Sequence, residues 1–141
     1  VGAIASRLAA EIYDLDILFE SAEDDIHNTT RFLLMASQPS IPKRGNRMIT
    51  TLVFQLRSVP AALYKSLGGF ATNGINLTKL ESYIRAGVLE QAQFYMDVEA
   101  HIDDPSMQNA MEELRFYCTK DEVHVLGTYP ASPARSLTPL S

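Results

Sequence analysis

The clearest alternation of hydrophobic and polar positions lies between residues 47 and 130. Apolar residues recur there at every second position in four segments, which predicts strands, and at every third or fourth position in two others, which predicts helices. The order strand, helix, strand, strand, helix, strand is typical of the split βαβ, ferredoxin-like arrangement, an α+β fold with an antiparallel four-stranded sheet and both helices on one face. The strands are expected at residues 48–57, 75–83, 92–100 and around 123–125.

Residues that favour helix ends support both predicted helices. Pro60 suits a first helical turn because its missing N–H is not needed there, and Asn73–Gly74 is a stop signal for the same helix. Asp104–Pro105 is a favoured N-cap and first-turn pair for the second helix. Gly68–Gly69 falls inside the first helix and is interpreted as a close-packing or fraying point. Imperfect alternation in the second strand predicts a bulge or a surface with two uses.

The first 46 residues carry a weaker pattern. Apolar residues at steps of four predict a helix over residues 1–13. Short apolar runs predict strands at residues 15–19 and 32–35, although periodicity alone does not separate such a run from a buried helix. Residues 36–46 contain two prolines and a glycine, so we interpret them as a linker and as the best candidate domain boundary.

Composition narrows the class of protein. The chain has 141 residues, of which 46% are hydrophobic and 21% charged, and this balance indicates a globular protein of one domain or slightly more. A net charge of −5 argues against nucleic acid as a partner, and no apolar run is long enough for a membrane span. A single cysteine argues against a disulfide framework and favours a cytoplasmic location. The three histidines are scattered, which argues against a zinc site. Because the chain starts without Met inside a predicted helix, we expect it to be a fragment.

Two segments could carry chemistry. In residues 28–32, NTTRF, a threonine hydroxyl beside an arginine could hold a carboxylate, but a strand-start turn with a salt-bridged arginine explains the same residues more simply. In residues 58–63, SVPAAL, free amides at a helix start suit an anion, and the small Ala61 and Ala62 allow a ligand to approach the backbone. A helix start and stop without a ligand is equally consistent with this second segment.

The segments together resemble the C-terminal part of prephenate dehydratase. Residues 28–32 resemble the family's N-x-T-R-F motif at the end of the catalytic domain. Residues 60–64 occupy the place of the Gly-Ala-Leu-Val motif of its ACT regulatory domain, and residues 80–82, LES, match the start of the Glu-Ser-Arg-Pro motif. Residues 94–101 and 125–130 resemble the third and fourth ACT strands.

The resemblance implies a domain organisation and an activity. Residues 1–46 would be the end of the catalytic domain with its linker, residues 47–130 the ACT domain, and residues 131–141 a disordered tail. The whole enzyme would convert prephenate to phenylpyruvate, water and CO2, without a metal or organic cofactor. Most of the catalytic domain would lie upstream, so the chain alone is expected to be inactive.

The same resemblance implies roles for three residues of the first segment. Thr30 would be the catalytic threonine, with a hydrogen bond to the departing hydroxyl that strengthens as charge builds there. Arg31 would anchor a carboxylate or orient Thr30, and Phe32 would pack beneath them.

For the ACT domain the resemblance implies phenylalanine as a feedback effector, bound at the interface of a homodimer or higher oligomer. Helix-start amides of one subunit and the loop before the second strand of its neighbour would meet the ligand. The effector-binding candidates are Pro60, Ala61, Ala62, Leu63, Asn76, Leu77, Glu81 and Ser82. Ala61 stands where the motif has glycine, Tyr64 where it has valine, and Tyr83–Ile84 where it has Arg-Pro. Two alternatives remain open, namely a non-catalytic dimeric amino-acid sensor and a dimerisation domain that has lost its ligand.

Overall fold

The computed structural model describes residues 2–24, 30–45, 47–84 and 92–133. The chain divides into two compact units, residues 1–35 and residues 36–141, which are described separately. The first unit contains one helix, α1 (Arg7–Tyr13), among its described residues. The elements of the second unit are β1 (Met48–Leu56), α2 (Ala62–Thr72), β2 (Leu77–Ile84), β3 (Ala92–Val98), α3 (Pro105–Tyr117) and β4 (Cys118–Pro130).

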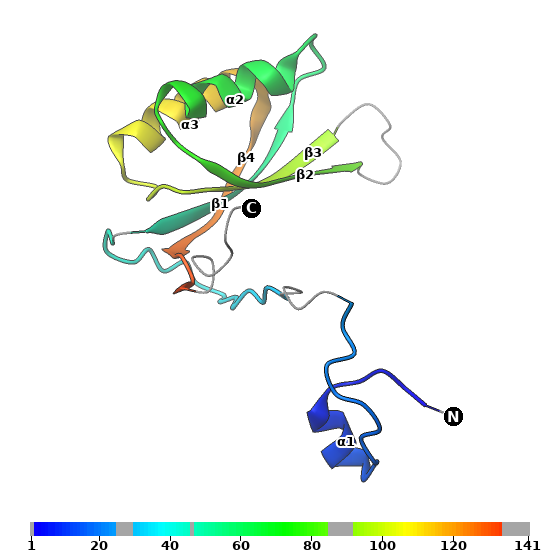
Figure 1. The fold of residues 1–141 in the computed structure, drawn as a ribbon. Coiled ribbons are helices and arrows are strands. Elements are labelled where there is room, and N and C mark those ends of the chain that lie inside the picture. Colours follow the sequence, from blue (N-terminus) through cyan, green and yellow to red (C-terminus); the bar gives the residue numbers. More distant parts are fainter. Residues whose placement is uncertain (1, 25–29, 46, 85–91, 134–141) are drawn as a thin grey trace. The chain divides into compact units, whose positions relative to one another are not determined.

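The second unit has the predicted ferredoxin-like fold. Its strands form one antiparallel sheet in the order β2-β3-β1-β4. Both α2 and α3 pack on the same face of this sheet (Figure 1). Because β1 is paired on both sides, eight of its nine residues are buried. The predicted βαββαβ order and the position of the helices are confirmed.

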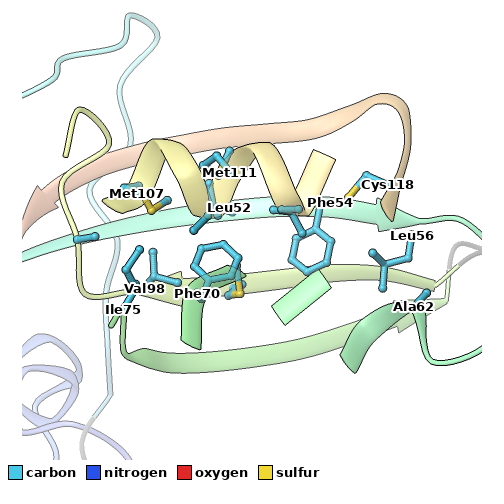
Figure 2. Packing of buried hydrophobic residues seen from close by; sticks show 14 residues of the cluster. Leu52, Phe54, Leu56, Ala62, Phe70, Ile75, Val98, Met107, Met111 and Cys118 are labelled. Atoms are coloured by element: carbon cyan, nitrogen blue, oxygen red, sulfur yellow. The ribbon is translucent and has the colours of Figure 1, made fainter. Parts of the chain in front are cut away.

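The hydrophobic core lies between the sheet and the two helices. Leu52 and Phe54 of β1 meet Phe70 of α2 and Met111 of α3, and all four side chains are fully buried (Figure 2). The Phe54 ring also stacks on Phe94 of β3, with the ring centroids 5.4 Å apart. This arrangement explains the alternation along β1, since every second residue enters the core.

The helix ends agree with the sequence signals except at Pro60, which precedes the N-cap Ala61 and therefore lies outside α2. Asp104 is the N-cap of α3 and Pro105 begins that helix, while Asn73 caps the C-terminus of α2. Gly74 follows with a φ of +67°, a left-handed conformation that favours glycine. A register shift between Leu77 and Lys79 confirms the irregularity predicted for the second strand. None of the described helices combines the length and the apolar character that crossing a bilayer requires.

In the first unit, the predicted helix is shorter than expected. Ser6 is the N-cap of α1, and its hydroxyl accepts a hydrogen bond from the Ala9 N–H at 3.2 Å, so the helix begins at Arg7 rather than at residue 1. The strands predicted at residues 15–19 and 32–35 are wrong, because both segments are irregular. A strand needs a neighbour to receive its backbone hydrogen bonds, and no described residue of this unit is in a strand.

Some predictions fall outside the described residues. Asn28 and Thr29 of the first segment do so, as does residue 134 onward of the predicted tail. The predicted linker, residues 36–46, belongs to the second unit with the sheet, although its residue 46 is not described.

Candidate effector site and candidate catalytic residues

A hollow of about 340 Å³ lies beside the start of α2. Its lining combines apolar side chains from β1 and β3 with the loop that connects β1 to α2. Three of the predicted effector residues, Ala61, Ala62 and Leu63, line it. Pro60 lies in the same turn but is not among the lining residues. The remaining lining residues are Leu56, Arg57, Ser58, Val59, Ala92 and Phe94.

The backbone at the start of α2 suits an anionic group. Ala61 is the N-cap and has a left-handed conformation with a φ of +57°. The Ala62 N–H donates to the Val59 carbonyl at 3.1 Å, and the Lys65 N–H donates to the Ala61 carbonyl at 3.0 Å, which closes the first turn. The other N–H groups of the first turn have no carbonyl one turn earlier in the helix, and the helix dipole makes this end positive. A carboxylate is therefore favoured at this end of α2.

Arg57 fixes the loop that forms one wall of the hollow. Its backbone N–H donates to the Tyr117 carbonyl at 3.0 Å. Its guanidinium donates to the Phe116 carbonyl and lies 5.3 Å from the centre of the Phe116 ring. These contacts tie the loop to the C-terminal end of α3 and leave a cation in the lining of the hollow.

Arg57 and Phe94 line the hollow but were not predicted as site residues. Phe94 was predicted as a strand residue, and its place opposite Phe54 becomes visible only from the pairing of β1 with β3. A signal for Arg57 was present, since it is the only charged residue between the end of β1 and α2. The contact by which Arg57 connects the loop to α3 was not predictable from the sequence, because its partner Phe116 lies 59 positions later.

Asn76 and Leu77 lie far from the hollow within one chain. Leu77 is opposite Val98, and Val98 is opposite Thr50 near the start of β1. The hollow adjoins Leu56 at the other end of β1, six residues away, which corresponds to roughly 20 Å along a strand. These residues and the hollow could share a ligand only if two chains contributed to it.

Glu81 and Ser82 are neighbours on β2 and therefore point to opposite faces of the sheet. Ser82 is opposite Phe94, which places it on the face that carries the hollow. Glu81 is on the other face, where it accepts a hydrogen bond from Tyr83 and lies 3.1 Å from the Lys79 ammonium. The hydrogen bond from Tyr83, followed by that from Lys79, lowers the pKa of the Glu81 carboxyl. Of this pair, Ser82 is therefore the one on the face of the hollow.

Thr30, Arg31 and Phe32 lie in an irregular, exposed segment of the first unit. Phe32 is 87% exposed, so its packing beneath the other two residues stays a prediction. Among the described residues, no group of three or more His, Cys, Asp or Glu side chains comes together as a metal site would require. Thr30 and Arg31 are both exposed in this chain.

The βαββαβ order, with two helices on one face of an antiparallel sheet, gives the second unit the ferredoxin-like fold of the ACT class. Residues 1–40 match the family model described as prephenate dehydratase. The resemblance to prephenate dehydratase is thereby confirmed, and similarity to a curated protein that carries this activity in its name extends over 94% of the chain.

Two curated relatives illustrate the match. The chain is 48% identical over 134 residues to a bifunctional N-acyl-homoserine lactone acylase/prephenate dehydratase of Komagataeibacter europaeus, which covers 94% of this chain and 47% of that protein. It is 37% identical over 130 residues to a bifunctional chorismate mutase/prephenate dehydratase of Aquifex aeolicus, which covers 92% of this chain and 34% of that protein. The chain thus spans half or less of the length of these relatives.

Two solved structures are similar to this chain. One is the quorum quenching acylase GqqA, with 44% identity and a TM-score of 0.63 over 70% of this chain and 50% of that chain. The other is prephenate dehydratase from Arthrobacter aurescens in complex with L-Phe, with 27% identity and a TM-score of 0.57 over 67% of this chain and 33% of that chain.

Proposed function

We propose that the second unit binds phenylalanine and regulates a prephenate dehydratase of which residues 1–40 form the end of the catalytic domain. The observation that carries this proposal is the hollow at the start of α2, which combines helix-start amides with an apolar floor. The related structure from Arthrobacter aurescens was solved with L-Phe. Phenylalanine has the two groups that such a hollow requires, an anionic carboxylate and an apolar ring.

The ligand would be oriented by its two ends. Its carboxylate would accept hydrogen bonds from the first-turn amides of α2, supported by the positive charge of Arg57. Its ring would lie against Leu56 and Phe94. A second chain would add Asn76 and Leu77, which supports a homodimer as the binding form.

The first unit supports the catalytic part of the proposal. Its match to the family model includes Thr30, Arg31 and Phe32. In the intact enzyme, the Thr30 hydroxyl would donate a hydrogen bond to the departing hydroxyl of prephenate, an interaction that strengthens in the transition state. Arg31 would pair with a substrate carboxylate.

Calorimetry with phenylalanine on this chain tests the effector site. Val59 lines the hollow and is 43% exposed, so a Val59→Asp variant places a negative charge next to the expected position of the ligand carboxylate. We expect it to weaken binding about tenfold or more, the cost of an uncompensated like charge. Val125→Asp is the matched control, since Val125 is 42% exposed on β4 and is not among the lining residues. Absence of binding at millimolar phenylalanine would overturn the effector assignment.

The catalytic assignment requires the longest reading frame that contains this chain. In that protein, Thr30→Ala should abolish most dehydratase activity, whereas Thr30→Ser keeps a hydroxyl and should retain part of it. Full activity of Thr30→Ala would exclude Thr30 as the catalytic threonine. If phenylalanine binds but no dehydratase activity is found, the non-catalytic sensor is the better description.

Hydrolysis of N-acyl-homoserine lactones is a second candidate function. It is favoured by the bifunctional relative of Komagataeibacter europaeus and by the acylase structure, which are 48% and 44% identical to this chain. Release of a fatty acid from an N-acyl-homoserine lactone, assayed with the same longest protein, tests it. Dehydratase activity without this release would reject the second candidate.

A further inference from the structure

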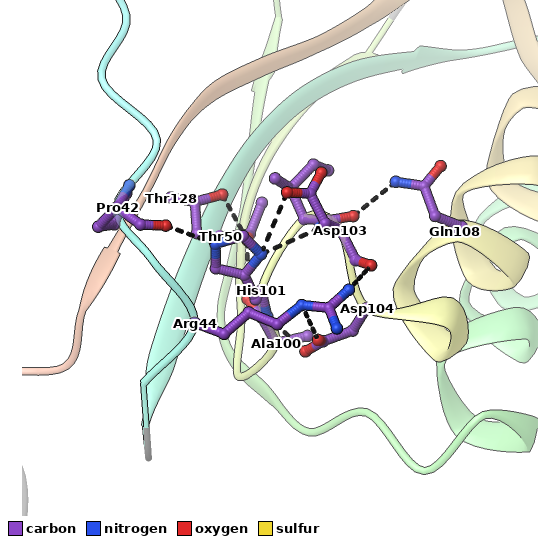
Figure 3. A network of polar contacts seen from close by, with 10 residues as sticks. Pro42, Arg44, Thr50, Ala100, His101, Asp103, Asp104, Gln108 and Thr128 are labelled. Atoms are coloured by element: carbon purple, nitrogen blue, oxygen red, sulfur yellow. Dashed lines mark hydrogen bonds and ion pairs between the residues drawn. The ribbon is translucent and has the colours of Figure 1, made fainter.

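The loop between β3 and α3, residues 99–104, holds the linker in place (Figure 3). The His101 side chain is 3% exposed, and its Nε2 lies 2.8 Å from the Pro42 carbonyl oxygen. The Asp103 N–H donates to His101 Nδ1 at 3.1 Å, so Nδ1 is the acceptor and the hydrogen of the neutral ring is on Nε2. His101 therefore donates a buried hydrogen bond to the linker backbone.

A second contact joins the same loop to Arg44 of the linker. The Arg44 Nε lies 3.2 Å from Asp104 Oδ1, and its guanidinium also donates to the Asp103 carbonyl. The other carboxylate oxygen of Asp104 accepts the His101 N–H at 3.0 Å. One carboxylate thus orders the loop and binds the linker.

Glu99 extends this network to the predicted effector loop. Its Oε2 accepts a hydrogen bond from Asn76 Nδ2 at 2.9 Å, and its N–H donates to the Asn76 carbonyl at 2.9 Å. Its Oε1 accepts a hydrogen bond at 3.2 Å from Arg47, the residue that joins the linker to β1. A single carboxylate therefore connects a candidate effector residue with the end of the linker.

Arg47, Glu99, His101 and Asp104 of this network line one hollow of about 290 Å³. Asn76, at the entry to β2, contacts the same loop through Glu99. The lining residues are Gly45, Arg47, Met48, Glu99, Ala100, His101 and Asp104. Along the chain, the linker connects β1 with the segment that contains Thr30.

We propose that Glu99 and His101 are positioning residues that couple the effector loop, Asn76–Leu77, to the linker. This inference rests on the proposed effector site and adds the route by which that site acts. A ligand that contacts Asn76 changes the bonding of Glu99, which changes how firmly Arg47 and the preceding linker are held. By thermodynamic reciprocity, the state of the linker alters ligand affinity by the same factor.

Hydrogen exchange of the 141-residue chain tests the route without any ligand. Asn76→Ala and Glu99→Gln should each raise amide exchange in residues 41–48 about threefold, the size expected for a partly exposed ion pair or hydrogen bond. Glu112→Gln makes the same charge change on the exposed side of α3 and should leave this segment unchanged. Exchange in α3 is the internal reference, because a global loss of stability would accelerate it too. Unchanged exchange in residues 41–48 of the Asn76→Ala variant would overturn the coupling.

A pair of His101 variants tests the buried contact. His101→Ala should raise exchange in residues 41–48 about tenfold relative to α3, since it removes a buried donor. His101→Gln retains an N–H donor of similar reach and should restore most of the protection. Equal effects of the two variants would show that His101 acts by packing and not by positioning the linker.

Phenylalanine separates this inference from the proposed function. If phenylalanine binds, exchange in residues 41–48 should change in the wild-type chain and stay constant in Glu99→Gln. Binding without that change in the wild type would overturn the coupling and leave the effector site intact. Absence of binding would overturn the effector site, and the result for Asn76→Ala would still decide whether the contact route exists.

Discussion

The two units use apolar residues in different ways. In the second unit, 14 buried residues form one core between the sheet and the helices. In the first unit, α1 has no buried residue, and the large apolar side chains of its described residues are exposed. The exposed residues are Ile4, Leu8, Ile12, Tyr13, Leu15, Ile17, Leu18, Phe19, Phe32, Leu33, Leu34 and Met35. An apolar pattern therefore produces stable structure only where a complementary surface covers it.

The interactions that shape the first unit are local and weak. The Ser6 cap orders the first turn of α1, and an exposed ion pair joins Arg7 to Glu20. A seven-residue helix is too short to be stable alone, and an exposed ion pair contributes less than about 1 kcal/mol. In the proposed parent enzyme, the rest of the catalytic domain would cover these side chains and supply the missing stability.

The largest expected effect contrasts a core residue with an exposed one. Phe54→Ala removes a fully buried ring and should lower the free energy of unfolding by about 3–5 kcal/mol. Leu34→Ala removes a fully exposed side chain and should change it by less than about 0.5 kcal/mol. Urea unfolding followed by circular dichroism measures both values. A large cost for Leu34→Ala would show that residues 30–35 are covered in solution, for instance by a second copy of the chain.

The second expected effect concerns a buried thiol at the junction of α3 and β4. Burial raises the pKa of the Cys118 thiol to about 11, and the charge of Arg57 opposes this shift. In the unfolded chain the pKa is about 8.5, so between these values the unfolded thiol loses its proton while the folded one keeps it. The stabilising contribution is thus complete below about pH 8.5 and is lost as pH rises toward 11, and solvent screening limits it to at most about 3 kcal/mol.

A Cys118→Ala variant isolates this contribution from other groups that titrate in the same range. Unfolding midpoints at about pH 8 and about pH 10.5 should differ more for the wild-type chain than for the variant. Identical pH dependence would show that the thiol is accessible to water. This test also contrasts the two units, because the second unit contains Cys118 and the first unit contains no cysteine.

The sequence was sufficient for the second unit because its patterns are local and mutually consistent. Alternation along β1 and three-to-four spacing in α3 each point to the same core, and the end signals Asp104 and Gly74 agree with them. The strands predicted at residues 15–19 and 32–35 do not form, since these apolar runs have no partner strand among the described residues. Strand formation depends on a neighbour, and a short run does not reveal whether the neighbour exists.

The sites were only partly predictable for a related reason. Ala61, Ala62 and Leu63 were predicted at a helix start, where the structure has them, and their role in effector binding stays a prediction. The contact of His101 with the linker and the contact of Arg57 with α3 each join residues 59 positions apart. Such contacts follow from the tertiary fold, and no periodicity in the sequence encodes them.

The third expected effect distinguishes two adjacent glycines of α2. A Cβ at Gly69 would lie 2.8 Å from Glu113 Cβ of α3, so Gly69→Ala forces the helices apart and should destabilise the second unit by about 1–2 kcal/mol. A Cβ at Gly68 meets nothing within 4 Å, so Gly68→Ala should stabilise it by up to about 1 kcal/mol through helix propensity. Thermal unfolding of the two variants shows whether each substitution stabilises or destabilises the second unit. If both variants were stabilised, the close approach of α2 and α3 would be wrong.

The smallest expected effect compares three alanines in different settings. Ala61 has a φ of +57°, a conformation that costs a residue with a Cβ about 1–2 kcal/mol. Ala61→Gly relieves this cost but increases the entropy of the unfolded chain, so a net gain of about 0.5–1 kcal/mol in unfolding free energy is expected. Ala71→Gly, within α2, should instead lower the free energy of unfolding by up to about 1 kcal/mol. Ala9→Gly, within α1, should leave the unfolding of the second unit unchanged, because the first unit forms a separate compact unit.

These three values are obtained from one set of urea titrations at a single pH. A loss for Ala61→Gly as large as that for Ala71→Gly would contradict the left-handed start of α2. If Ala9→Gly lowers the free energy of unfolding as much as Ala71→Gly does, the two units unfold together. The units would then differ in burial and not in stability. If Ala61→Gly also strengthens phenylalanine binding, the methyl group of Ala61 restricts the access of the ligand to the first-turn amides of α2. The family motif has glycine, without a methyl group, at this position.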